Sequence, residues 1–244
     1  MIFTFAERLS DSPFVERIWR AQSERTGEFL SVAASQWEMV VSKYHGETTV
    51  TVRGPETKAT PMHVTLVGSE FFGIIFKYGA FMPHFPVSEI VDGDLDLPDA
   101  SSKSFWLNGS PWQFPNYENA DTFVDRLVRE GLLDCDPIIE PVLRGEPQDL
   151  SPRSVQRRFL QATGLTQGSI RKIDRARHAT ILLQQGVSIL DTVERTGYSD
   201  QAHLTRALKH LMGKTPAQII KKASLSRCRF CSRQPRSAEL SFIC

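Results

Sequence analysis

The chain of 244 residues has no long hydrophobic run and no recognisable export signal. No uninterrupted apolar stretch reaches the roughly 20 residues that a membrane-spanning helix needs. The opening residues, MIFTFAERLSDSPF, lack the basic segment followed by an apolar segment that marks a signal peptide. These absences argue against a membrane protein and against a secreted one, so we expect a cytoplasmic protein with no membrane partner.

Cysteine is scarce, with single residues at Cys135, Cys228, Cys231 and Cys244. Without a secretion signal, these side chains are expected to be thiols rather than disulfides. Cys228 and Cys231 form one C-x-x-C pair, but no histidine follows His210, so the four ligands of a structural zinc ion are not at hand. We therefore predict no bound metal and no cofactor.

Signatures of catalysis are also missing. The sequence contains no G-x-S-x-G nucleophile motif and no H-x-H pair. His45, His63 and His84 are the candidates for a catalytic metal site, and they are well separated along the chain. We expect a protein that is not an enzyme, and a metal enzyme is the alternative.

The net charge of +1 conceals a strong asymmetry along the chain. Residues 1–150 contain 12 Lys and Arg against 23 Asp and Glu, whereas residues 151–222 contain 13 against 4. A basic segment beside an acidic one indicates a polyanionic partner for the basic part, and a merely solvated basic surface is the alternative.

Residues from Phe29 to about Phe85 have the pattern of short β-strands. The segments WEMVVSKY, ETTVTVRG, MHVTLVG and FFGIIFKYGAF are rich in β-branched and aromatic residues, and turn residues separate them. This rhythm predicts an antiparallel sandwich or barrel. Pro98–Pro115 is expected to be a loop, and the first domain is predicted to span residues 1–118.

Helical patterns begin near Asn119. The segment NADTFVDRLVREGLL places Phe123, Leu127 and Val128 on one apolar stripe, which predicts a helical linker over residues 119–136. That stripe suits either the pairing of two chains or packing on the barrel. Residues 137–222 are predicted to be helices and short turns, and residues 223–244 a disordered tail.

The segment YSDQAHLTRALKHLMGKTP, residues 198–216, combines two different helix faces. Its apolar stripe consists of Leu204, Ala207, Leu208 and Leu211. The opposite face carries side chains that can hydrogen-bond base edges and phosphates. Because the short helix SILDTVERTG precedes it across a glycine-containing turn, the pattern predicts a helix-turn-helix whose second helix enters the major groove of DNA.

These motifs resemble those of a known family. SPRSVQRRF, ATGLT, RARHATILL and GYSDQAHLTRALKHLMGKTPAQI match, in order, the DNA-binding domain of the AraC/XylS-type transcriptional regulators. The resemblance covers about Leu150 to Ile220 and implies two helix-turn-helix units on one connecting helix, which read two successive major-groove faces of double-stranded DNA. The residues that it implies as DNA contacts are Arg153, Gln156 and Arg157 in the first recognition helix and Gln201, Ala202, His203, Thr205, Arg206 and Lys209 in the second.

The first unit departs from the family pattern. Only GEPQDL separates the helix that ends at Arg144 from the helix cap at Ser151, so this unit is either truncated or uses Pro137–Arg144 as its supporting helix. Three further arginines are expected to contact phosphate, an acidic neighbour or nothing rather than a base: Arg158, Arg175 and Arg177.

The β-rich first domain resembles the cupin-type effector domains of many such regulators, and Glu70–Phe81 resembles a strand and loop that are common in them. The implied fold class is α+β, with an N-terminal antiparallel, cupin-like β-barrel followed by an all-α double helix-turn-helix domain. Five aromatic residues could line an apolar barrel mouth that holds a small ligand or could fill the core: Trp37, Phe76, Phe81, Phe85 and Trp106.

The sequence therefore predicts a sequence-specific DNA-binding transcriptional regulator that responds to an unidentified small-molecule effector. The family suggests a homodimer, and RNA polymerase as a further partner. Two alternatives stay open: a cupin-like metal enzyme tethered to a helical domain, and a protein-interaction adaptor whose helix-turn-helix domain no longer binds DNA.

Overall fold

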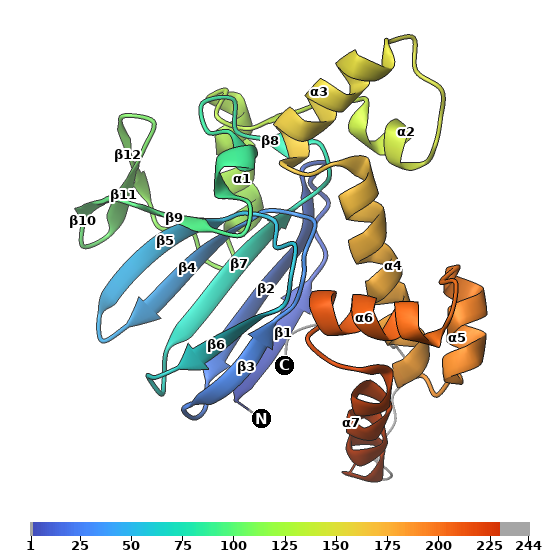
Figure 1. Cartoon of the computed structure of the whole chain (residues 1–244). Coiled ribbons are helices and arrows are strands. Elements are labelled where there is room, and N and C mark those ends of the chain that lie inside the picture. Colours follow the sequence, from blue (N-terminus) through green and yellow to red (C-terminus); the bar gives the residue numbers. More distant parts are fainter. Residues whose placement is uncertain (1, 230–244) are drawn as a thin grey trace.

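The computed structural model describes residues 2–229, and Figure 1 shows a curved β-sheet with helices along one side. The central sheet has six antiparallel strands in the order β1-β2-β7-β4-β5-β9. These strands are β1 (Phe3–Arg8), β2 (Val15–Ser23), β4 (Glu38–Tyr44), β5 (Glu47–Arg53), β7 (Glu70–Phe76) and β9 (Asp94–Leu97).

Three smaller sheets accompany the central one. They are formed by β3 (Gly27–Ser31) with β6 (Thr60–Val64), by β8 (Ala80–Phe81) with β13 (Asp134–Cys135), and by β10 (Asp99–Ser101), β11 (Ser104–Leu107) and β12 (Ser110–Gln113). The strands predicted between Phe29 and Phe85 are confirmed, whereas β1 and β2 were not predicted.

One face of the central sheet carries the N-terminal core. Alternating residues of β4 and β7, such as Met39 and Ile74, are fully buried on it, as the two-residue period of a strand requires. Trp37 stacks on Phe76 with 3.9 Å between ring centroids, and its indole N–H donates to the carbonyl of Ala80. Trp37 and Phe76 therefore fill the core and do not line a cavity mouth.

The predicted closed barrel is wrong. Within residues 2–229, β1 and β9 are the two edges of the central sheet and do not pair with each other. Strands β3 and β6 pair only with each other, so they do not complete a ring. A closed barrel requires every strand to have two neighbours, and an open sheet with smaller attached sheets is observed instead. The α+β class, with strands first and helices after them, is confirmed.

The prediction of a loop over Pro98–Pro115 is also wrong, because β10, β11 and β12 lie there. The turn between β11 and β12 contains Asn108 and Gly109, which both have positive φ angles (47° and 76°). Two such residues make the type I′ turn that hairpins prefer, and Asn-Gly is its strongest sequence signal. This signal was present in the sequence and could have predicted the hairpin.

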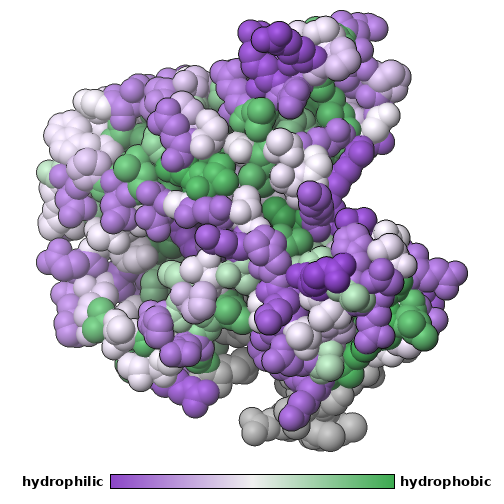
Figure 2. Space-filling view, viewed as in Figure 1, coloured by the Kyte–Doolittle hydropathy of each residue, from purple (hydrophilic) through white to green (hydrophobic). Residues whose placement is uncertain are grey.

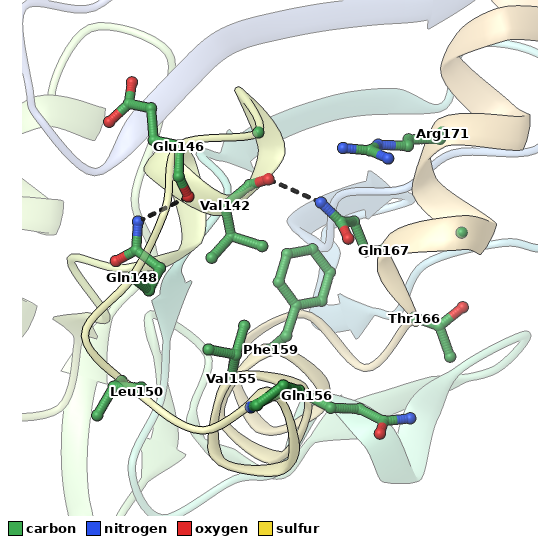
Figure 3. A pocket seen from close by; sticks show the side chains of 13 residues that line it. Val142, Glu146, Gln148, Leu150, Val155, Gln156, Phe159, Thr166, Gln167 and Arg171 are labelled. Carbon is green, nitrogen blue, oxygen red and sulfur yellow. Dashed lines mark hydrogen bonds between the residues drawn. The ribbon is translucent and has the colours of Figure 1, made fainter.

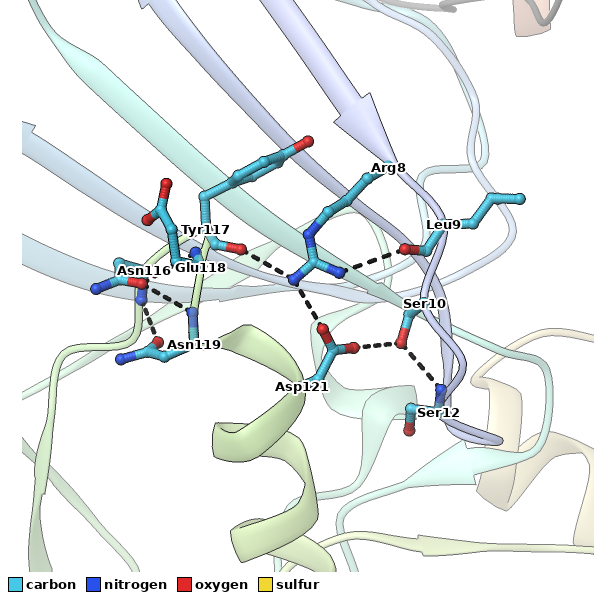
Figure 4. A network of polar contacts seen from close by, with 9 residues as sticks. All are labelled: Arg8, Leu9, Ser10, Ser12, Asn116, Tyr117, Glu118, Asn119 and Asp121. Carbon is cyan, nitrogen blue, oxygen red and sulfur yellow. Dashed lines mark hydrogen bonds and ion pairs between the residues drawn. The ribbon is translucent and has the colours of Figure 1, made fainter.

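Helix α1 (Ala120–Arg129) packs on the N-terminal core. Phe123 and Leu127 are buried there and Val128 packs against it, so this stripe is not free to pair two chains. Figure 4 shows how the helix start is tied to the end of β1: Arg8 pairs with Asp121 at 2.7 Å and donates to the carbonyl of Tyr117. Of the two roles considered for this stripe, the structure shows packing on the sheet domain.

The C-terminal part consists of six helices among the described residues. They are α2 (Ile139–Leu143), α3 (Pro152–Thr163), α4 (Gln167–Gln184), α5 (Ile189–Thr196), α6 (Gln201–Leu211) and α7 (Pro216–Arg229). Their shared core includes Phe159, Ile173, Leu183 and Leu204. Ala33, with Tyr78 and Phe81 from the N-terminal part, joins this core, so the two parts pack directly on each other.

No helix within residues 2–229 is long and apolar enough to cross a membrane. Helix α7 continues to Arg229, beyond the predicted start of a disordered tail at residue 223. The rest of that tail, with Cys231 and Cys244, lies outside the described residues. Cys135 is a free thiol.

Substitution of Gly73 in β7 tests the packing of the central sheet. A Cβ atom at this position would lie 2.2 Å from the Trp19 ring, so Gly73→Ala should lower the free energy of unfolding by about 1–3 kcal/mol. Gly168→Ala is the matched control, because a Cβ in the first turn of α4 meets only the Thr166 hydroxyl at 3.8 Å. The control should raise stability by up to about 1 kcal/mol. Urea unfolding measures both, and equal stability of Gly73→Ala and wild type would contradict this packing.

Candidate nucleic-acid interface

The second helix-turn-helix unit consists of α5, a tight turn and α6. Gly197 ends α5 in the left-handed conformation with φ 69°, which glycine adopts without steric cost. Asp200 then caps α6, because its carboxylate accepts the backbone N–H of His203 at 2.7 Å. Leu204, Leu208 and Leu211 are buried against the helical core, as the sequence predicted.

The buried stripe of α6 determines which of its side chains reach solvent. Gln201, Ala202, Arg206 and Lys209 are exposed. His203 and Thr205 are half-buried, and both have internal partners: the His203 ring lies within 3.1 Å of the Ser199 hydroxyl, and the Thr205 hydroxyl donates to the carbonyl of Gln201. The exposed set is therefore the part of the predicted reading face that is free for another molecule.

The first unit presents α3 in the same way. Ser151 caps the helix by accepting the N–H of Ser154, and Pro152 occupies the first helical position, as predicted. Arg153, Gln156 and Arg157 are exposed.

Arg158 lies on the other side of α3 and forms two hydrogen bonds to the Asp136 carboxylate at 2.7 and 2.8 Å. This confirms the acidic neighbour expected for it. Of the two alternatives for the first unit, the structure supports the second: α2 lies within Pro137–Arg144 and packs on α3 through Ile139 and Val142.

A cavity of about 650 Å³ lies between α2, α3 and α4 in this first unit. Figure 3 shows Val155 and Phe159 of α3 beside it, and Gln167, at the start of α4, donating to the carbonyl of Val142. The 145–150 connection leaves this space open, whereas the second unit is closed by buried leucines. The first recognition helix therefore borders an open hollow on one side and packs on α2, β8 and η1 (Val87–Ile90) on others.

Helix α4 sets the separation of the two recognition helices. It spans 18 residues, or about 27 Å at 1.5 Å per residue. Figure 1 places α3 near one end of α4 and α6 near the other, and Figure 2 shows a notch between these helices with many hydrophilic residues around it. Successive major-groove faces repeat about every 34 Å, so this spacing fits one duplex once the width of the recognition helices is added.

The middle of α4 docks on the sheet domain through polar contacts. The Arg177 guanidinium donates to the carbonyl of Ala33 at 3.2 Å, and the hydroxyls of Ser35 and Tyr78 donate to Asp174 at 3.3 and 3.2 Å. Burial lowers the pKa of Arg177 and raises the pKa of Asp174, and the hydrogen bond from Tyr78 opposes the second shift. Arg177 is half-buried in this contact, whereas Asp174 stays exposed at its edge and is held there by the two hydroxyls.

The end of α6 docks on the same domain. Its last carbonyls, of His210 and Leu211, accept backbone N–H groups from Ala59 and Ala33 at 2.9 and 2.8 Å. Gly213 follows with φ 66°, and a Cβ there would lie 2.8 Å from Leu30. The C-terminal end of the recognition helix is therefore fixed, while its N-terminal end, with Gln201 and Ala202, is exposed.

The helical segment that contains both units also matches a known family. Residues 148–222 match the model of a family described as a helix-turn-helix domain. This segment is a helix-turn-helix domain of the AraC type. The match begins after α2, so it includes both recognition helices but not the short helix that supports the first. Searches of curated proteins and of solved structures gave no significant match.

The family match confirms the resemblance stated for the C-terminal domain, and it leaves the cupin-like assignment of the N-terminal part as a prediction. The contacts of individual residues with bases are also still predictions. Arg175, which was not expected to read a base, lies over the Tyr198 ring at 4.5 Å and donates to the carbonyl of Gly197.

The five aromatic residues predicted for an effector site are not brought together. Trp37 and Phe76 lie in the N-terminal core, and Phe81 packs against the helical core. Phe85 and Trp106 line a second, smaller cavity.

The three candidate metal-binding histidines are also apart. His45 lies in the turn after β4, His63 lies on β6 at 3.7 Å from Glu28, and His84 follows β8. No group of three or more His, Cys, Asp or Glu side chains suited to hold a metal ion occurs in the described part of the chain.

Several side chains of this interface escaped the sequence analysis. Arg171 and Lys172 are exposed on α4, opposite the buried Ile170 and Ile173, and the helical period could have found them. The pairing of Asp174 with residues of the sheet domain joins positions more than ninety residues apart. No local pattern indicates such a contact.

The Asp200 cap gives the second unit a pH-dependent stability. The N–H of His203 lowers the pKa of Asp200 below the value of about 3.9 that it has in an unfolded chain. A carboxyl group whose pKa is lower in the folded protein stabilises the fold at pH values above its pKa in the unfolded chain. This contribution is lost as the pH falls through its pKa in the folded protein. Wild type should therefore melt at a higher temperature than Asp200→Ala at pH 7, and the gap should shrink below about pH 4.

Ser188→Ala is the control for this measurement. Ser188 caps α5 through the N–H of Asp191, and its hydroxyl carries no charge. Circular dichroism melts between pH 7 and pH 3 should show a deficit for Ser188→Ala that is independent of pH. An equally constant deficit for Asp200→Ala would contradict the assigned role of its charge.

Proposed function

We propose that this protein is a sequence-specific DNA-binding transcriptional regulator whose N-terminal domain responds to a small-molecule effector. The observation that carries the proposal is the exposed polar N-terminal half of α6 in an AraC-type helix-turn-helix domain. A recognition helix contacts base edges with the residues near its N-terminus. Gln201 and Arg206 have the side chains that hydrogen-bond adenine and guanine edges, respectively.

The charge of the domain supports the same function. Residues 151–222 carry 13 Lys and Arg against 4 Asp and Glu, and exposed cations lie on α3, α4 and α6. Arg153, Arg171 and Lys209 are among them. Contacts of such residues with phosphates fix the position of a protein on the duplex, and base contacts then supply the choice of sequence.

The two alternatives predict different behaviour. An adaptor with a degenerate domain would bind DNA weakly and without sequence preference, because only its basic surface would act. A metal enzyme would need ligands brought together, and His45, His63 and His84 lie on separate elements.

Selection of bound duplexes from a random-sequence DNA pool tests the proposal. Purified full-length protein at near-physiological salt should enrich one motif. Arg206→Ala should blur that motif at one or two positions, with a loss of about 1–3 kcal/mol in discrimination there. Arg129→Ala is the matched control, because Arg129 is an exposed cation on α1, outside the helix-turn-helix segment 148–222.

Three results decide the matter. A motif that is sharp for wild type and Arg129→Ala and blurred for Arg206→Ala supports base reading by α6. A motif unchanged by Arg206→Ala overturns the role of that side chain. Binding without any enrichment, with equal affinity for unrelated duplexes, overturns the proposed function in favour of the adaptor.

A further inference from the structure

A second cavity of about 260 Å³ lies in the sheet domain, away from the helix-turn-helix units. Its apolar floor includes Val52 of β5 and Leu97 of β9. Phe85 and Trp106 form part of its wall, and the Trp106 side chain is unusually exposed for an aromatic residue, at 44%. Figure 2 shows hydrophobic residues gathered over this upper part of the sheet domain. Large exposed aromatic residues beside an apolar hollow are typical of ligand sites.

Two polar side chains border the cavity, His84 and Asn108. Both are exposed and neither has a hydrogen-bond partner within residues 2–229, so they are free to pair with a molecule bound in the hollow beside them. Burial lowers the pKa of His84, which favours the neutral imidazole with one donor and one acceptor. Asn108 is held with φ 47° in the turn between β11 and β12. An apolar site with a few polar groups at its edge selects an apolar molecule and fixes its orientation.

The cavity is open to solvent on the side of Trp106, so its volume indicates the size of the group that it can hold rather than an upper limit on the whole molecule. A cavity of about 150 Å³ accepts benzene, and drug-sized ligands occupy about 300–1,000 Å³. A single aromatic ring with a small polar substituent therefore fits 260 Å³, and a sugar or nucleotide does not match the apolar lining.

The cavity is connected directly to the first helix-turn-helix unit. Met82, His84 and Phe85 line it, and the same segment continues through the short 3-10 helix η1 (Val87–Ile90) to Val91. Helix α3 packs against both β8 and η1.

At the end of α3, Gly164 meets this segment closely. A Cβ built on Gly164 would lie 3.0 Å from a Val91 methyl and 3.1 Å from the Val87 carbonyl. Residues 82–91 therefore pack closely against the C-terminal end of the first recognition helix.

We propose that this cavity binds a small monocyclic aromatic molecule and that residues 82–91 transmit its presence to α3. The transmission to α3 rests on the proposed function, whereas the binding of the molecule does not, because binding can be measured without DNA. A ligand acts on α3 through a difference in its affinity for two arrangements of this segment.

Titration calorimetry without DNA tests the site, with phenol, benzyl alcohol and indole as probes and glycerol as the polar control. At least one aromatic probe should bind wild type with a Kd of about 1 mM or tighter, and glycerol should not bind. Trp106→Ala should weaken this binding at least about tenfold, which corresponds to 1.4 kcal/mol. Leu95→Ala is the control, because Leu95 is exposed on β9 and lies outside the cavity.

Titration of the selected duplex, with and without the bound probe, tests the coupling. The probe should change the Kd for DNA by about fivefold or more in wild type. Val91→Ala should keep probe binding and lose this change, because it removes the methyl groups that pack against the helical core beside Gly164. Val67→Ala makes the same chemical change at an exposed position outside the cavity and η1 and should behave like wild type.

Each outcome has one meaning. Absence of aromatic binding, or binding that Trp106→Ala leaves intact, overturns the site. Binding without any effect on DNA affinity, or an effect that Val91→Ala retains, overturns the transmission through residues 82–91. If no DNA motif exists while probe binding depends on Trp106, the proposed function fails and the ligand site stands.

Discussion

The docking of α4 on the sheet domain is the contact on which the arrangement of this molecule depends. Arg177 and Asp174 lie one helical turn apart and reach the same strip of the sheet domain, around Ala33 and Ser35. Arg177 is half-buried and donates to the Ala33 carbonyl, while Asp174 accepts from two hydroxyls of the sheet domain. Because these hydrogen bonds are directional, the contact favours one orientation of the helix over others. Because both recognition helices are attached to α4, this orientation places them as well.

The sheet domain has a network of charged side chains near this contact, and its Glu38 interacts electrostatically with Arg177. On the side of the sheet away from the N-terminal core, Arg53 pairs with Glu38 at 3.2 Å and with Glu56 at 2.8 Å, and the indole of Trp19 donates to Glu38. Burial raises the pKa of Glu38, and Arg53 opposes that shift. Some of the acidic residues in 1–150 therefore form ion pairs with arginines of the same domain. The exposed cations of the helical domain remain accessible to a polyanion.

Local patterns predicted the helices and their ends well. Ser151, Gly164 and Gly197 act as the caps that their residue types indicate, since capping depends on neighbouring backbone alone. The closed barrel failed for the opposite reason: whether β1 and β9 meet depends on the path of many strands, and no short segment encodes it. The hydrogen bond from Tyr78 to Asp174 could not be predicted either, because it also joins residues that are far apart in the sequence. In the candidate site, helical period separated the exposed Arg206 from the buried Leu204, but it could not show that His203 and Thr205 have partners inside the molecule.

The docked α4 should present α3 and α6 to successive major-groove faces of a single duplex. Hydroxyl-radical footprinting of the full-length protein on its selected site tests this most directly. Two protected patches are expected on one face of the DNA, about 10 base pairs apart from centre to centre. A single protected patch under the second unit alone would contradict it, because the docked α4 would then not be presenting both helices at once.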